Sequence, residues 1–171
     1  MDRVDLAGAV HRTAAEMESR DAARVLVVDD EPELRQALRI RLAGQGYDVA
    51  TAGDGVEAMR ELRRAPADVV LLDLHIPAGT GFKICERIRA TPALAATPVI
   101  AITADPTPRA EQRCFELGCA AFFLKPYDSL DLLVAIERAI GRREEDGPRR
   151  FPPPRDTKAS GRAARPGGPR T

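Results

Sequence analysis

Five side chains of this sequence combine acidic, hydroxyl and basic groups, and each stands at the end of a short apolar run. They are Asp29, Asp30, Asp73, Thr103 and Lys125. Three carboxylates that lie close together cannot all stay ionised without a cation, and Mg²⁺ suits a few carboxylates plus waters. The lysine would add a positive charge and the threonine a hydroxyl donor. Such a group would stabilise an anion on one carboxylate, and a phosphoryl group in transfer is the natural candidate.

These residues come together only if the apolar runs form neighbouring strands. The runs are residues 24–28, 47–51, 67–74, 98–103 and 120–124, and they alternate with helical patterns over about 32–43, 55–64, 82–90, 109–117 and 129–140. Strands that alternate with helices predict a parallel sheet with helices on both faces. The central run is uniformly apolar, as a strand buried on both faces should be. Because the carboxyl ends of parallel strands share one edge, the five side chains are expected at one crevice.

Helical periodicity also predicts which side chains of the helices face the sheet. In the second helix these are Val56, Met59 and Leu62. In the last helix, which Asp128 or Ser129 would cap, the inward residues are Leu130, Leu133, Val134, Ile136, Ala139 and Ile140. The adjacent aromatics Phe122 and Phe123 should point to opposite faces of the sheet, because side chains alternate along a strand.

One folded domain is expected over residues 24–141, between two segments of different composition. Residues 1–23 have few apolar side chains and are expected to be flexible or weakly helical, with Met17 a possible true start of the chain. Residues 142–171 are rich in proline, glycine and arginine, carry nine basic and four acidic residues, and are expected to be disordered. Residues 25–141 are mildly acidic, with 13 basic and 17 acidic residues.

Four motifs in this order make the sequence resemble the receiver domain of two-component response regulators, of the single-domain type found among chemotaxis regulators. They are Val27-Val28-Asp29-Asp30-Glu31, Leu71-Leu72-Asp73-Leu74-His75-Ile76-Pro77 with Gly81 beyond it, Thr103-Ala104, and Lys125-Pro126. The similarity covers residues 24–141. It implies a flavodoxin-like, doubly wound α/β fold with five parallel strands in the order 2-1-3-4-5 and helices on both faces.

The resemblance also implies a phosphoryl-accepting site. Asp73 would be the phosphoacceptor. Asp30, Asp73 and the backbone carbonyl of His75 would hold Mg²⁺ directly, and Asp29 would act largely through water. Lys125 would bind a phosphoryl oxygen.

Three further positions would connect this site to the rest of the domain. Thr103 would hydrogen-bond another phosphoryl oxygen and shift toward it, which would leave room for Phe122 to turn inward as a second switch residue. His75 and Asp105 stand at the two positions that tune the lifetime of the phosphoryl group in similar receivers.

The expected function is therefore a phosphorylation-dependent switch in a phosphorelay, not an enzyme. A sensor histidine kinase or a histidine phosphotransfer protein would supply the phosphoryl group. A downstream protein would bind the surface formed by the helix at 109–117, the strand at 120–124 and the last helix. Because only the basic tail follows that helix, a receiver without an output domain is expected. Nucleic acid is not an expected partner, since Phe151 is the one aromatic residue of the tail.

Two other functions fit parts of the pattern. One is an adaptor that kept the fold and works without phosphate, although the complete set of acidic, threonine and lysine positions argues against it. The other is a magnesium-dependent phosphatase of the haloacid dehalogenase type, which also uses an aspartate at a strand end. That class has an Asp-x-Asp motif, and His75 stands at its second aspartate position here.

Composition argues for a cytoplasmic protein without a membrane partner. No apolar stretch approaches the roughly 20 residues that a membrane-spanning helix needs. The N-terminus also lacks a basic segment followed by an apolar one, as a secretory signal would have. Cys85, Cys114 and Cys119 form no CxxC pair, so they are interpreted as reduced cysteines of the core.

Overall fold

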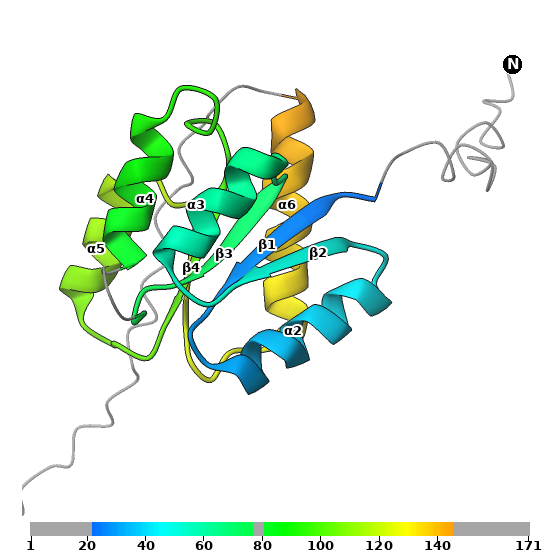
Figure 1. The fold of residues 1–171 in the computed structure, drawn as a ribbon. Coiled ribbons are helices and arrows are strands. Elements are labelled where there is room, and N and C mark those ends of the chain that lie inside the picture. Colours follow the sequence, from blue (N-terminus) through cyan, green and yellow to red (C-terminus); the bar gives the residue numbers. More distant parts are fainter. Residues whose placement is uncertain (1–21, 77–80, 146–171) are drawn as a thin grey trace, which may run out of the picture.

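The computed structural model describes residues 22–76 and 81–145, which form a sheet covered on both faces by helices (Figure 1). The strands are β1 (Arg24–Val28), β2 (Asp48–Ala52), β3 (Val69–Asp73), β4 (Val99–Thr103) and β5 (Ala121–Leu124). The helices are α2 (Pro32–Gly44), α3 (Gly55–Arg64), α4 (Gly81–Ala90), α5 (Pro108–Glu116) and α6 (Ser129–Glu145). Nearly all of the two expected terminal segments, 1–23 and 142–171, lies outside the described residues.

The five strands are parallel and follow the order β2-β1-β3-β4-β5, which confirms the expected topology. β3 lies in the middle of the sheet, and every one of its residues is buried. This explains why its sequence is a continuous apolar run rather than an alternation of apolar and polar residues. The order changes direction between β1 and β3, so the crevice beyond their carboxyl ends is the expected site of function.

Each face of the sheet has its own apolar core. α3, α4 and α5 cover one face, where Met59, Ile84 and Cys114 are buried. α2 and α6 cover the other face, where Leu38 and Leu132 are buried. Phe122 packs against the first core and Phe123 against the second, which confirms their predicted alternation.

The prediction of inward-facing side chains was wrong for Val56, Leu130 and Val134. They are 73%, 71% and 44% exposed. In α6 the buried residues are Leu132, Ile136 and Ala139, whose spacing of four and three marks the true inner face. Because apolar residues also stand on either side of Leu132, the sequence pattern did not decide which face of α6 turns toward the sheet. Val56 lies in the first turn of α3, outside the part that the core covers.

The ends of the elements follow the sequence signals closely. Asp128 caps α6, because its Oδ1 accepts the main-chain N–H of Leu130 over 2.7 Å. α6 continues to Glu145, beyond the expected domain end at residue 141. Within the described ranges, no helix is both long and apolar enough to cross a membrane.

α4 begins where its main chain comes unusually close to the end of β3. A Cβ atom on Gly81 would lie 2.6 Å from the carbonyl oxygen of Asp73 and 2.6 Å from Cα of Leu74. The Gly81 N–H also donates to the carbonyl oxygen of Leu74 over 3.1 Å. Only glycine permits this approach, so Gly81 fixes the first turn of α4 against the strand that carries Asp73.

All three cysteines are buried and free, which agrees with their interpretation as core residues. They come from α4, from α5 and from the loop before β5, and they meet in the core under α4 and α5. The Sγ atoms of Cys85 and Cys119 lie 3.7 Å apart. The hydrogen bond to Cys119 and burial raise the pKa of the Cys85 thiol.

Candidate functional site

Strand pairing brings the five predicted side chains to the carboxyl edge of the sheet. Asp29 follows β1 and Asp73 ends β3, and these two strands are paired in a register that makes the two aspartates neighbours. Asp30 comes next after Asp29. Thr103 ends β4, and its carbonyl oxygen accepts the main-chain N–H of Lys125 over 2.8 Å. Four different strands therefore supply the residues of one site.

Asp29, Asp30 and Asp73 form an acidic cluster in which one oxygen of each carboxylate lies within 4.8 Å of the others. Asp29 and Asp73 are buried, whereas Asp30 is partly exposed. No side chain within the described ranges bonds to the Asp30 carboxylate, so its oxygens can turn toward a ligand. Carboxylate oxygens at this spacing fit a hard divalent cation, and Mg²⁺ prefers such donors. The cluster could therefore hold the kind of ion that the sequence predicted.

Lys125 supplies the positive charge of the site. Its Nζ donates to Oδ2 of Asp73 over 2.8 Å and to Oδ2 of Asp29 over 3.1 Å. Burial of the lysine disfavours its charged form, but the hydrogen bonds to Asp73 and Asp29 outweigh burial and raise the pKa of Lys125. The ammonium is therefore charged at neutral pH and compensates part of the negative charge of the cluster.

The two oxygens of Asp73 have different partners. Oδ2 faces Lys125, and Oδ1 accepts the main-chain N–H of His75 over 2.8 Å. Both contacts fix the carboxylate at the strand end, where an oxygen could act as a nucleophile. Asp73 is 4% exposed, so these donors serve a buried carboxylate.

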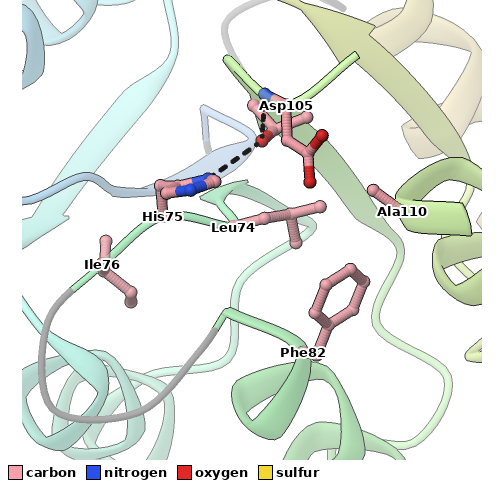
Figure 2. Close-up of a pocket in the computed structure, with 7 residues that line it drawn as sticks. Leu74, His75, Ile76, Phe82, Asp105 and Ala110 are labelled. Carbon is pink, nitrogen blue, oxygen red and sulfur yellow. Dashed lines mark hydrogen bonds between the residues drawn. The ribbon is translucent and has the colours of Figure 1, made fainter. Parts of the chain in front are cut away.

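A cavity of about 400 Å³ opens beside Thr103, between the first turns of α4 and α5 (Figure 2). His75, Thr103 and Asp105 form its polar wall, while Leu74 and Phe82 are among its apolar lining residues. The Thr103 hydroxyl oxygen accepts the main-chain N–H of Asp105 over 3.1 Å and lies 3.4 Å from Nδ1 of His75. Both partners of the hydroxyl, His75 and Asp105, therefore belong to the wall of the cavity.

The carboxylate of Asp105 is turned toward the start of α5 and not toward Thr103. Its Oδ1 accepts the main-chain N–H of Thr107 over 2.9 Å. The hydrogen bonds from the backbone and side chain of Thr107 lower the pKa of Asp105, and the nearby ring of His75 lowers it further. Asp105 thus connects the end of β4 with the first turn of α5.

Phe122 lies apart from the acidic cluster. It is on β5 opposite Ala101 of β4, is partly buried, and packs toward the core under α3, α4 and α5. Its role as a switch residue stays a prediction.

Two residues that contact the site were not predicted from the sequence as site residues. Glu31 lies 3.8 Å from Nζ of Lys125, and its main-chain N–H donates to Oδ1 of Asp29 over 2.9 Å. Arg35 donates from its guanidinium to the carbonyl oxygen of Asp29 over 2.6 Å. Glu31 adjoins the acidic pair in sequence and could have been included. Arg35 has no comparable signal, because its contact depends on how α2 leaves β1.

Comparison with known families agrees with this fold and site. The family model described as the response regulator receiver domain matches residues 25–137. The chain therefore belongs to the receiver family of two-component response regulators, whose members are signalling domains.

Three of the individual relatives illustrate the similarity. The chain is 37% identical over 125 residues to the DNA-binding response regulator MtrA of Mycolicibacterium smegmatis, which covers 73% of this chain and 53% of that protein. It is 37% identical over 134 residues to the sensor histidine kinase RcsC of Salmonella typhimurium, covering 78% of this chain and 14% of that protein. The solved structure of the chemotaxis protein CheY4 of Vibrio cholerae is 32% identical with a TM-score of 0.66, covering 70% of this chain and 99% of that one. The chain spans about half the length of the MtrA and RegX3 regulators that it matches.

Proposed function

We propose that Asp73 accepts a phosphoryl group from a phosphohistidine and that the resulting aspartyl phosphate switches the binding of a downstream protein. The donor would be a sensor histidine kinase or a histidine phosphotransfer protein. The observation that carries the proposal is the surroundings of Asp73. This buried carboxylate has two further carboxylates beside it and the Lys125 ammonium 2.8 Å away. Membership in the receiver family supports the same chemistry.

In the proposed reaction an oxygen of Asp73 attacks the phosphorus atom of the donor. The phosphorus–nitrogen bond breaks, and the donor histidine keeps the electron pair. Asp30, Asp73 and the backbone carbonyl of His75 would hold Mg²⁺, with Asp29 acting through water. The cation would neutralise charge on the group in transfer. Lys125, which contacts Asp73 before the transfer, would bind a phosphoryl oxygen afterwards.

The proposed switch begins at Thr103. Its hydroxyl would turn to a phosphoryl oxygen, and the space released would let Phe122 turn inward from the adjacent strand. The changed surface would be that of α5, β5 and α6, which is the proposed binding face for the downstream partner. His75 and Asp105 are proposed to tune the lifetime of the phosphoryl group.

The protein would act as a switch, without a separate enzymatic activity, and we propose the cytoplasm as its location. The domain that carries this function is proposed to span residues 24–141.

DNA binding is part of the name of MtrA, of which the chain covers 53%. Neither nucleic acid nor a membrane is among the proposed partners.

Intact-protein mass spectrometry tests the proposal directly. The protein is incubated with Mg²⁺ and acetyl phosphate or phosphoramidate, with Asp73→Asn as the variant and Asp131→Asn, an exposed change on α6, as the matched control. We expect one added phosphoryl group in the wild type and in the control, no addition in Asp73→Asn, and no addition after chelation of Mg²⁺. A wild type that gains no mass with any donor would contradict the proposal and favour the phosphate-independent adaptor.

A further inference from the structure

The ring of His75 contacts the hydroxyl that the proposed switch has to move. Nδ1 of His75 lies 3.4 Å from the Thr103 hydroxyl oxygen, and the main-chain N–H of Asp105 donates to the same oxygen over 3.1 Å. Figure 2 marks these two contacts of His75 and Asp105 with dashed lines. Thr103 is 0% exposed, so solvent does not supply a partner. A hydroxyl has one proton and two lone pairs. The main-chain N–H takes one lone pair, and the ring, in either tautomer, takes the proton or the other lone pair.

The same residue also contacts the proposed phosphoacceptor. The main-chain N–H of His75 donates to Oδ1 of Asp73, while its ring reaches across to Thr103 on the neighbouring strand. Lys125 occupies the second oxygen of Asp73. Among the described residues, the Thr103 hydroxyl therefore bonds on the side of His75 and Asp105, and not to the Asp73 carboxylate.

We propose that His75 is a positioning residue whose ring holds the Thr103 hydroxyl away from Asp73 in the unphosphorylated protein. The inference rests on the proposed function. A phosphoryl group on Asp73 would bring three strong acceptor oxygens to the site. To reach one of them, the hydroxyl would have to turn from the side of His75 toward Asp73, which breaks the contact with the ring in either tautomer. The contact between His75 and Thr103 therefore opposes switching, and its removal shifts the equilibrium toward the switched arrangement.

The surroundings explain why the ring, and not another side chain, has this role. The carboxylate of Asp105 is engaged by Thr107, so Asp105 offers Thr103 only its main-chain N–H, which every substitution except proline retains. The ring of His75 is exposed and borders the cavity, so it can leave Thr103 without a clash. A contact of 3.4 Å to an exposed ring is weak, so the expected effect is a shift of a few fold rather than an on–off change.

The test is a double-mutant cycle on the equilibrium binding of a phosphoryl analogue. Beryllium trifluoride with Mg²⁺ is titrated into the wild type, His75→Ala, Thr103→Ala and the double variant, and amide signals of α5 and β5 are followed by NMR. We expect His75→Ala to lower the half-saturating analogue concentration about two- to fivefold when Thr103 is present, and to change nothing in the Thr103→Ala background. A role of His75 that does not act through Thr103 would shift both backgrounds equally.

Two further measurements separate the possible outcomes. The Mg²⁺ affinity of every variant is measured first, and the analogue is titrated at a Mg²⁺ concentration that saturates each of them, so that a change in Mg²⁺ binding is not mistaken for a change in analogue binding. The inference is overturned if analogue binding in His75→Ala is unchanged or weaker, or if both backgrounds shift equally. The proposed function still stands in that case, provided that the wild type is phosphorylated. A wild type that neither binds the analogue nor gains phosphoryl mass overturns both.

Discussion

Lys125 bonds to two carboxylates of the acidic cluster and so neutralises part of a charge that would otherwise be unpaired in a buried place. Its side chain is 18% exposed, and those of Asp29 and Asp73 are each 4% exposed. A residue with these contacts serves the folded state and the proposed chemistry at once. It follows that the lysine should matter for stability even when no phosphoryl donor is present.

Replacing Lys125 tests this dual role. Lys125→Met keeps most of the side-chain volume but leaves the carboxylates of Asp29 and Asp73 without their cation. We expect a loss of about 1–3 kcal/mol in the free energy of unfolding at pH 7, measured by urea denaturation without Mg²⁺. Added Mg²⁺ should restore part of the loss. Lys83→Met, an exposed change on α4, is the matched lysine control, and no loss is expected from it.

The pH dependence of this effect has a definite sign. The pKa of Lys125 is raised above 10.5 in the folded protein, so its contribution to stability is complete below the unfolded value of 10.5. The contribution is lost only as the pH rises through the folded pKa. The stability difference between wild type and Lys125→Met should therefore be constant from about pH 7 to 9 and shrink above about 10.5. A difference that grew at alkaline pH would contradict the assignment.

Among the elements, strands were easier to predict than the faces of helices. The uniformly apolar strand at Val69–Asp73 and the alternating pair Phe122 and Phe123 have a period of two that leaves little freedom. The helix at Ser129–Glu145 contains apolar residues on more than one face, and only contact with the sheet selects Leu132 over Leu130. The meeting of the five side chains at one edge was predictable because parallel strands end there, whereas their roles stay a prediction. The contacts of Arg35 and the ring of His75 were not, because they depend on loop geometry.

Two leucines of α6 give a matched test of the corrected helix face. Leu132 is 2% exposed and Leu130 is 71% exposed. Leu132→Ala should lower the free energy of unfolding by about 2–5 kcal/mol, because it leaves a cavity in the core under α2 and α6. Leu130→Ala should change it by no more than about 0.5 kcal/mol. The free energy of unfolding of both variants is measured by urea denaturation. Equal losses in the two variants would show that the inner face of α6 is wrongly assigned.

The start of α4 offers a second test at this scale. Gly81→Ala places a Cβ atom 2.6 Å from main-chain atoms of β3 and the residue after it, so either the helix or the strand end must shift. We expect a loss of about 1–3 kcal/mol in stability and slower phosphorylation of Asp73, because the displaced strand end carries this proposed phosphoacceptor. Gly44→Ala is the matched control, since a Cβ there meets nothing within 4 Å. A Gly81→Ala protein as stable as the control would contradict the proposed role of this close approach.

At the scale of the whole molecule, the site belongs to the sheet and not to any one segment. β1, β3, β4 and the residue after β5 each contribute to it, and these strands are held between two separate cores. A ligand bound at this edge therefore contacts several parts of the fold together. Binding should stabilise the native state as a unit, by an amount that grows with the logarithm of ligand concentration.

The reactivity of the three buried cysteines reports how often the core beneath α4 and α5 opens to solvent. A thiol reagent in solution can reach Cys85, Cys114 and Cys119 only when the helices on their side of the sheet separate from it. Labelling followed by peptide mass spectrometry should thus show slow modification of all three at one common rate, which Mg²⁺ and a phosphoryl donor reduce. Early labelling of Cys114 alone would contradict this expectation. It would mean that α5 detaches on its own, so that the proposed binding face opens locally while the rest of the domain stays folded.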